Sequence, residues 1–163
     1  MTYSNKSARQ IDRDCLSALK LLRAQTRLLK PFDPVQQHIV RYAVVLSSGA
    51  IERSVKGIIV DLVGQGASVE VMNYLSATIL DGGMNPHEDK ISRLLKRFKV
   101  QWASNFNSLM KSVVPRCRSG LKSLVDNRNA VAHGKPISIS FKDVLSYYCG
   151  ARNVVAELEK ALH

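Results

Sequence analysis

Apolar residues recur every three or four positions along almost the whole chain, which is the spacing of amphipathic helices. The first such stretch covers residues 7–29, and its apolar positions are Ile11, Cys15, Leu19 and Leu22. The second covers residues 34–63, with Asp33 placed to cap it and Pro34 in the first turn, where proline is favoured. The pattern predicts two long helices at the start of the chain.

Five further helices are predicted after the glycines at positions 64 and 66. Their expected ranges are 68–81, 85–98, 102–110, 115–133 and 142–162. Ser68 is the expected cap of the first of these, and Asn85-Pro86 is expected to open the second. The stretch Ile137–Phe141 alternates apolar and polar residues, but it is too short to make a sheet and is expected to be a loop. The expected fold is therefore all-α: a single domain over residues 1–163, built as a bundle of about six or seven helices.

The chain is strongly basic. Its 24 Lys and Arg residues outnumber 13 Asp and Glu residues, which gives a formal net charge of +11 over 163 residues. Such an excess favours nucleic acid or another polyanion as a partner, although charge alone does not specify which. The apolar content of 45% is ordinary for a globular domain, so the charge is the unusual feature of the composition.

Nothing in the sequence points to secretion, a membrane or a cofactor. The three cysteines, Cys15, Cys117 and Cys149, are odd in number and widely spaced, which indicates reduced thiols. The N-terminal residues lack the apolar core of a signal peptide, and no apolar run approaches the ~20 residues that span a bilayer. The histidines show no metal-ligand spacing, and no glycine-rich phosphate-binding motif is present. We expect a soluble cytoplasmic protein with no membrane partner, no metal and no cofactor.

The helix predicted over residues 115–133 carries an arginine in its apolar stripe. At about 100° per residue, Leu121, Leu124 and Val125 share one face, and Arg128 projects from the middle of that face. A guanidinium keeps its charge, so burial at this position requires one of three surroundings. They are an anionic partner, a subunit interface or a cleft open to a ligand.

His133 is the expected last residue of this helix, because Gly134 and Pro136 follow it and both stop helices. Histidine is the side chain most often used for acid–base catalysis near neutral pH. The spacing from Arg128 to His133 is common by chance, however, and a histidine at a helix C-terminus also serves simply as a cap. The pair by itself leaves a catalytic and a structural interpretation open.

The residues around the pair form a more specific pattern. In LKSLVDNRNAVAHG, residues 121–134, an arginine is followed by a polar residue, three further residues and a histidine at the end of a helix. This stretch resembles the signature of the HEPN superfamily, most closely its RiboL-PSP-HEPN branch. Three other stretches are similar to the same branch: SSGAIERSVKGII (47–59), NPHEDKISRLLKRF (85–98) and ISISFKDVLSYY (137–148). The resemblance covers most of the chain from about residue 35.

The resemblance implies a metal-independent endoribonuclease that cleaves RNA by attack of the 2′-hydroxyl on the adjacent phosphate. Such proteins work as homodimers, and the motif helices of the two subunits form a shared cleft. Carried over to this chain, Arg128, Asn129 and His133 are the catalytic residues. Many members are toxins or effectors in bacterial defence, so an antitoxin protein is a further candidate partner. Some of these toxins have a tyrosine two residues after the histidine, which the antitoxin modifies; this chain has Lys135 there, which puts that route in doubt.

Glu52 is the supporting carboxylate that the resemblance implies. It lies with Val45 and Ile59 in one row of the second predicted helix, because these three residues recur every seven positions. A carboxylate in an otherwise apolar row is expected to pair with a cation, and Arg128 is the candidate. The alternative is a salt bridge between helices that has no part in catalysis.

A one-sided basic segment precedes the motif helix. From Lys90 to Val125 the chain has no acidic residue. We expect basic side chains of this segment, and one beyond the motif, to follow an RNA backbone. The expected RNA-binding residues are Arg93, Lys96, Arg97, Lys122 and Lys135. The alternative is a solvated face with no ligand.

Two other functions remain open. The first is a HEPN-like module that binds RNA or holds a dimer together without cleavage. The second is a small basic DNA-binding protein, which the charge permits but no recognition-helix motif supports.

Overall fold

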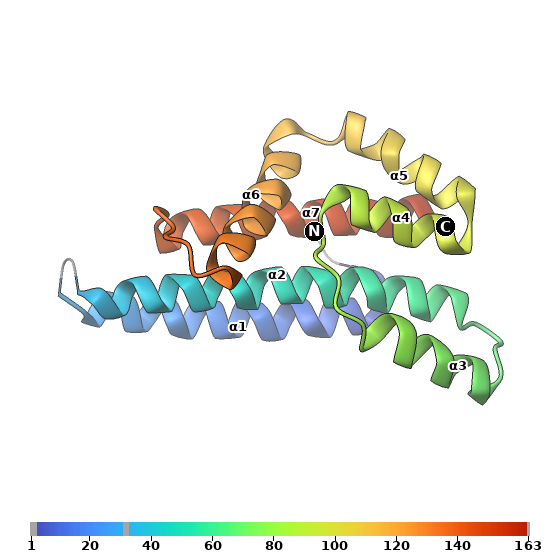
Figure 1. The fold of residues 1–163 in the computed structure, drawn as a ribbon, viewed down its shortest axis with the longest axis horizontal. Coiled ribbons are helices and arrows are strands. Elements are labelled where there is room, and N and C mark those ends of the chain that lie inside the picture. The colour runs from blue at the N-terminus through green and yellow to red at the C-terminus, as the bar shows by residue number, and fades with distance from the viewer. Residues whose placement is uncertain (1–2, 31–32, 163) are drawn as a thin grey trace.

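Seven α-helices and one short π-helix make up the part of the chain that the computed structural model describes, residues 3–30 and 33–162 (Figure 1). In chain order they are α1 (Lys6–Leu28), α2 (Pro34–Val63), α3 (Val69–Leu75), η1 (Ser76–Leu80), α4 (Glu88–Phe98), α5 (Val100–Ser112), α6 (Pro115–Ala132) and α7 (Phe141–Leu162). These residues contain no strand, and Ile137–Phe141 leads into α7 without pairing. The prediction of an all-α bundle is confirmed.

The two long helices form an antiparallel pair; α4, α6, α7 and η1 contact α2, whereas α5 packs on α4 and α7 (Figure 1). α2 is the central element, because it contacts α1, α4, α6, α7 and η1. Its core-facing residues include Ile51, Val55 and Ile59, which are fully buried. α3 extends beyond the rest of the bundle at the far end of α2 (Figure 1). No helix in the described residues is long and apolar enough to cross a membrane.

α6, the helix of the motif, packs most extensively on α7. Two glycines permit this close approach. A Cβ added at Gly120 would lie 3.2 Å from the Cα of Gly150, and one added at Gly150 would lie 3.2 Å from the Cα of Cys117. Because both are tighter than ordinary van der Waals contacts, larger residues would push the two helices apart. The glycines thereby set the position of α6 in the bundle.

A buried polar cluster joins the first and last helices. The carboxylate of Asp12 on α1 accepts hydrogen bonds from the hydroxyl of Tyr148, at 2.9 Å, and from the guanidinium of Arg152, at 2.5 Å. Burial, with Cys15 and Asp12 close by, raises the pKa of Tyr148 well above its usual range, so the phenol remains a donor. Removal of one partner would leave a buried charge or hydroxyl unpaired.

The predicted helix boundaries agree closely with the structure at most ends. α2 has the predicted range, the Asp33 side chain caps it by accepting from the N–H of Val35, and Ser68 caps α3 by accepting from Val71. The third predicted helix differs in its second half, which winds as a π-helix over Ser76–Leu80.

The start of the fourth predicted helix is wrong. Asn85 and Pro86 lie before α4, which begins at Glu88 with His87 as its N-cap. A proline disfavours helical backbone at the residue before it, so Asn85 is extended rather than helical. Hydrogen bonds to α2 and α6 hold this segment in place.

Candidate active site

α6 ends in a Schellman motif that presents His133 to solvent. The helix stops at Ala132, one residue earlier than predicted, and His133 is the C-cap. Gly134 has a φ of +67°, its N–H donates to Val131 O at 3.1 Å, and the N–H of Lys135 donates to Ala130 O at 2.8 Å. The imidazole of His133 has no hydrogen bond to any described residue, and the residue is exposed. The backbone around it is therefore held while the ring remains available.

Arg128 has the environment that the helical wheel predicts. Its neighbours Leu124 and Val125 are fully buried, and Arg128 itself is half-buried on the same side of α6. Its guanidinium Nη1 donates a long hydrogen bond, 3.5 Å, to Oδ1 of Asn129. Within residues 3–30 and 33–162 it forms no ion pair. The sequence left three possible environments for the Arg128 side chain. An anionic partner among the described residues is excluded, so a subunit interface or a cleft open to a ligand remains.

Asn129 is held by a second asparagine. Nδ2 of Asn85 donates to Oδ1 of Asn129 at 2.8 Å, the same oxygen that Arg128 approaches. A guanidinium only donates, so the atom of Asn129 that faces Arg128 must be the oxygen. The amide group of Asn129 consequently turns its Nδ2 away from both partners. No described residue accepts a hydrogen bond from that nitrogen.

Glu52 pairs with a cation other than the predicted one. Its Oε1 lies 2.5 Å from Nζ of Lys56, one turn later on α2, and accepts the N–H of Met84 at 2.6 Å. Lys56 Nζ also donates to the backbone oxygen of Gly82. The expected pairing with Arg128 is therefore wrong. Lys56 is on the same helix four residues away and reaches Glu52 without any rearrangement, so the carboxylate is already neutralised.

The segment before α4 connects Glu52 to the motif. Glu52 and Lys56 hold its backbone at Met84 and Gly82, and Asn85 contacts Asn129 on α6. Glu52 thus acts on the motif residues through this loop and not by direct contact. Sequence reasoning missed Asn85, because an asparagine before a proline is ordinary at a helix start and carries no sign of its distant partner.

Of the three predicted RNA-binding residues on α4, two line a groove and one does not. Arg93 and Arg97 line a groove of about 450 Å³ between η1 and α4, and Asn85 forms part of its wall. Lys96 is exposed on α4 but does not line this groove. The groove therefore lies directly beside the residue that holds Asn129.

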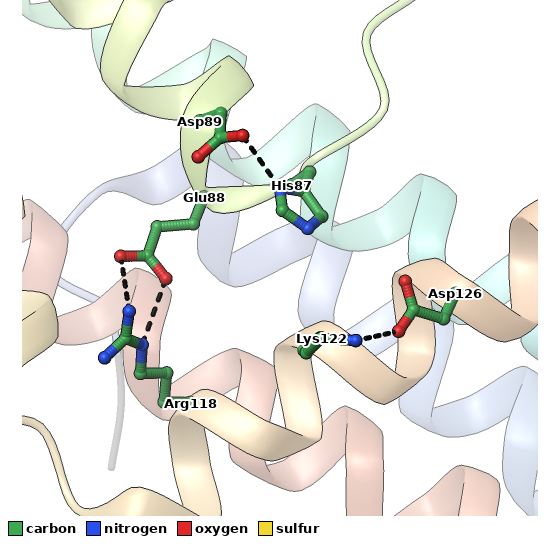
Figure 2. A network of polar contacts seen from close by, with 6 residues as sticks. All are labelled: His87, Glu88, Asp89, Arg118, Lys122 and Asp126. Carbon is green, nitrogen blue, oxygen red and sulfur yellow. Dashed lines mark hydrogen bonds and ion pairs between the residues drawn. The ribbon is translucent and has the colours of Figure 1, made fainter.

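The remaining predicted cations lie elsewhere. Lys122 is on an exposed part of α6, with its Nζ 2.5 Å from Oδ2 of Asp126. Near it, Arg118 forms two 3.0 Å hydrogen bonds with the carboxylate of Glu88 at the start of α4, as Figure 2 shows. Carboxylates thus pair with both Arg118 and Lys122. Lys135 is exposed in the loop two residues after His133.

Comparison with known proteins identifies a family for this chain. The family model described as RiboL-PSP-HEPN matches residues 9–163, almost the whole chain and more than the stretch from residue 35 on which the resemblance was based. No curated protein and no solved structure matches this chain.

Proposed function

Because the chain belongs to the RiboL-PSP-HEPN family, we propose that it is a metal-independent endoribonuclease with its active site at Arg128, Asn129 and His133. Membership of this family is compatible both with RNA cleavage and with RNA binding alone. The observation that favours cleavage is that Arg128 is a half-buried residue whose guanidinium no carboxylate of the described residues neutralises. A partly buried cation without a protein partner is suited to an anionic ligand, and RNA supplies one at every phosphodiester.

The reaction uses a nucleophile that RNA itself carries. A base removes the proton of the 2′-hydroxyl, the 2′-oxygen attacks the adjacent phosphorus, and the bond from phosphorus to the 5′-oxygen breaks. An acid protonates the departing 5′-oxygen, and the other fragment ends in a 2′,3′-cyclic phosphate. His133, exposed and free of hydrogen bonds to described residues, has the chemistry for either proton transfer.

The transition state accumulates negative charge on the non-bridging phosphate oxygens. Arg128 supplies directed N–H donors for these oxygens. The amide of Asn129, oriented by the 2.8 Å hydrogen bond from Asn85 to its Oδ1, presents its Nδ2 as a further donor.

One subunit contains a single His133, whereas the reaction needs both a base and an acid. We therefore include a homodimer in the proposal, with α6 of each subunit facing a common cleft and each His133 taking one role. Size-exclusion chromatography with light scattering is expected to give twice the chain mass. A monomer that still cleaves RNA would contradict the shared cleft.

The test is cleavage of a labelled RNA in EDTA by the wild type, Arg128→Ala and His133→Ala. We expect the wild type to cleave and each variant to lose about 100-fold or more in rate. Arg13→Ala, which removes an exposed arginine of α1, is the matched control and should retain full activity. Cleavage that requires a metal, or that survives in both site variants, would contradict the proposal.

The same experiment separates the alternatives. RNA binding without cleavage would identify a non-catalytic RNA-binding module. A preference for duplex DNA of the same length would identify a DNA-binding protein instead.

A further inference from the structure

The groove between η1 and α4 differs in charge from the neighbouring face that carries Arg118 and Lys122. Three basic residues at its edge, Lys90, Arg93 and Arg97, follow one face of α4 at helical spacing and are all exposed. None of them forms an ion pair with a described residue, whereas Arg118 and Lys122 on the neighbouring face are paired with carboxylates. No acidic residue lines the groove. Its positive charge is therefore available to a ligand.

The inner wall of the groove is apolar. Ile79 of η1 and Leu94 of α4 line it and are almost completely buried, and the half-buried Met84 lies between them in the chain. Methionine is flexible and polarisable, so it adapts to a flat ring. An apolar wall with a cationic edge fits a ligand that has both a flat apolar part and an anionic part. The volume, about 450 Å³, is in the usual range for small-molecule sites.

Asn85 joins this groove to the candidate active site. It lines the groove, and its Nδ2 bonds Oδ1 of Asn129 at 2.8 Å. A strand that occupies the groove therefore passes next to the residue that orients Arg128 and Asn129. Lys56 also lines the groove, but its charge is neutralised by Glu52, so we assign it a structural role and not a role in binding the ligand.

We propose that this groove is a subsite for one nucleotide of the substrate RNA, next to the scissile bond. Its phosphate lies on Arg93, Arg97 and Lys90, and its base lies against Ile79 and Met84. The inference rests on the proposed ribonuclease function and adds to it a position for the strand. A single-stranded RNA segment is the expected ligand, because a base stacked inside a duplex is not free to enter the groove.

The first test measures binding and not cleavage. A labelled ten-nucleotide RNA with 2′-O-methyl groups has no nucleophile and remains intact. Its affinity is measured by fluorescence anisotropy for the wild type, for Arg93→Ala/Arg97→Ala and for Lys99→Ala/Lys111→Ala. The second pair is the matched control, because it removes the same charge from exposed positions of the same basic segment without touching the groove.

We expect the groove variant to weaken binding about tenfold more than the control variant, with unchanged thermal unfolding for both. Equal weakening would mean that only the overall charge matters, and it would overturn the subsite. The second test replaces single nucleotides of the same RNA by abasic residues. One position is expected to lose affinity in the wild type and not in Arg93→Ala/Arg97→Ala. If no position is sensitive, the groove holds a phosphate only and the nucleotide assignment is wrong.

These results are independent of catalysis. If the groove is needed to bind the methylated RNA but the unmodified RNA is not cleaved, the proposed ribonuclease function is wrong and the nucleotide subsite is supported. If the wild type cleaves RNA but the two double variants weaken binding equally, the ribonuclease function is supported and the subsite is wrong. A wild type that binds no RNA would overturn both.

Discussion

Asn85 and Asn129, far apart in the sequence, are joined by a 2.8 Å hydrogen bond from Nδ2 of the first to Oδ1 of the second. The bond connects the loop before α4 to the motif helix. It also determines which end of the Asn129 amide faces Arg128, so Asn85 is a positioning residue for the candidate active site. The Oδ1 of Asn85 is buried and accepts no hydrogen bond from a described residue, so the bond to Asn129 is the side-chain hydrogen bond that holds Asn85.

Asn85→Asp should lower the rate of RNA cleavage about 10- to 100-fold, because small displacements of reacting groups have effects of that size. The new carboxylate has the same shape, but it only accepts hydrogen bonds and would repel Oδ1 of Asn129. We expect a lower kcat with KM nearly unchanged, and a lower melting temperature as well, because the new charge is partly buried. Asn107→Asp, an exposed asparagine on α5, is the control for the added charge. A variant with full kcat would show that Asn85 has no positioning role.

Glu52→Gln should destabilise the protein by about 3 kcal/mol, because it leaves the buried ammonium of Lys56 without its counter-charge. Glu52→Gln/Lys56→Met removes both charges and should recover much of that loss. Urea unfolding of the single and double variants measures the coupling. Arg128→Ala, in contrast, should leave the free energy of unfolding within about 1 kcal/mol of the wild type. A coupling of Glu52 to Arg128 as strong as that to Lys56 would contradict the observed pairing.

Gly134→Ala should lower the free energy of unfolding by about 1 kcal/mol, because a Cβ is disfavoured at a φ of +67°. No neighbour lies within 4 Å of such a Cβ, so the cost is conformational. Gly66→Ala is a close match, since Gly66 has a φ of +76° and similarly open surroundings. Both variants should lose similar stability, but only Gly134→Ala is expected to lower RNA cleavage, because Gly134 follows His133. Equal activity of the two would indicate that the helix end does not position the imidazole.

RNA affinity should fall steeply with salt, since the ligand is bound through phosphates. In a plot of log K against log salt concentration, Arg93→Ala/Arg97→Ala should reduce the slope by about 1.4, the value for two lost contacts to a single strand. Measurements between low and moderate ionic strength decide this. A flat response of the wild type would contradict the role of the basic groove.

Local periodicity was sufficient to predict the helices. The end of α2 and the caps at Asp33 and Ser68 depend on residues within one or two turns, which is the range over which sequence patterns are informative. The placement of Arg128 among apolar neighbours followed from the same periodicity, and the buried Leu124 and Val125 bear it out. The Schellman motif at Gly134 was predictable because glycine is the residue best suited to a positive φ.

The conformation of the segment around Asn85 could not be predicted from such local patterns. Its sequence matches a helix start, but hydrogen bonds from Met84 to Glu52 and from Asn85 to Asn129 hold it extended. Both partners lie on other helices. The same limit applies to the charges of the basic segment. Only the tertiary arrangement of α4 and α6 brings Arg118 to Glu88 and leaves Arg93 and Arg97 without an ion pair among the described residues.

The amino-acid sequence alone determined the helical bundle, its family and the residues of the motif, because helix periodicity and caps are local and the motif lies within one helix. Only the tertiary structure decided which charges are satisfied. The sequence predicted a pairing of Glu52 with Arg128, whereas the structure pairs Glu52 with Lys56 and leaves Arg128 without a carboxylate among the described residues. Electrostatic pairing depends on the distance in space between side chains, and that distance is set by how the helices pack.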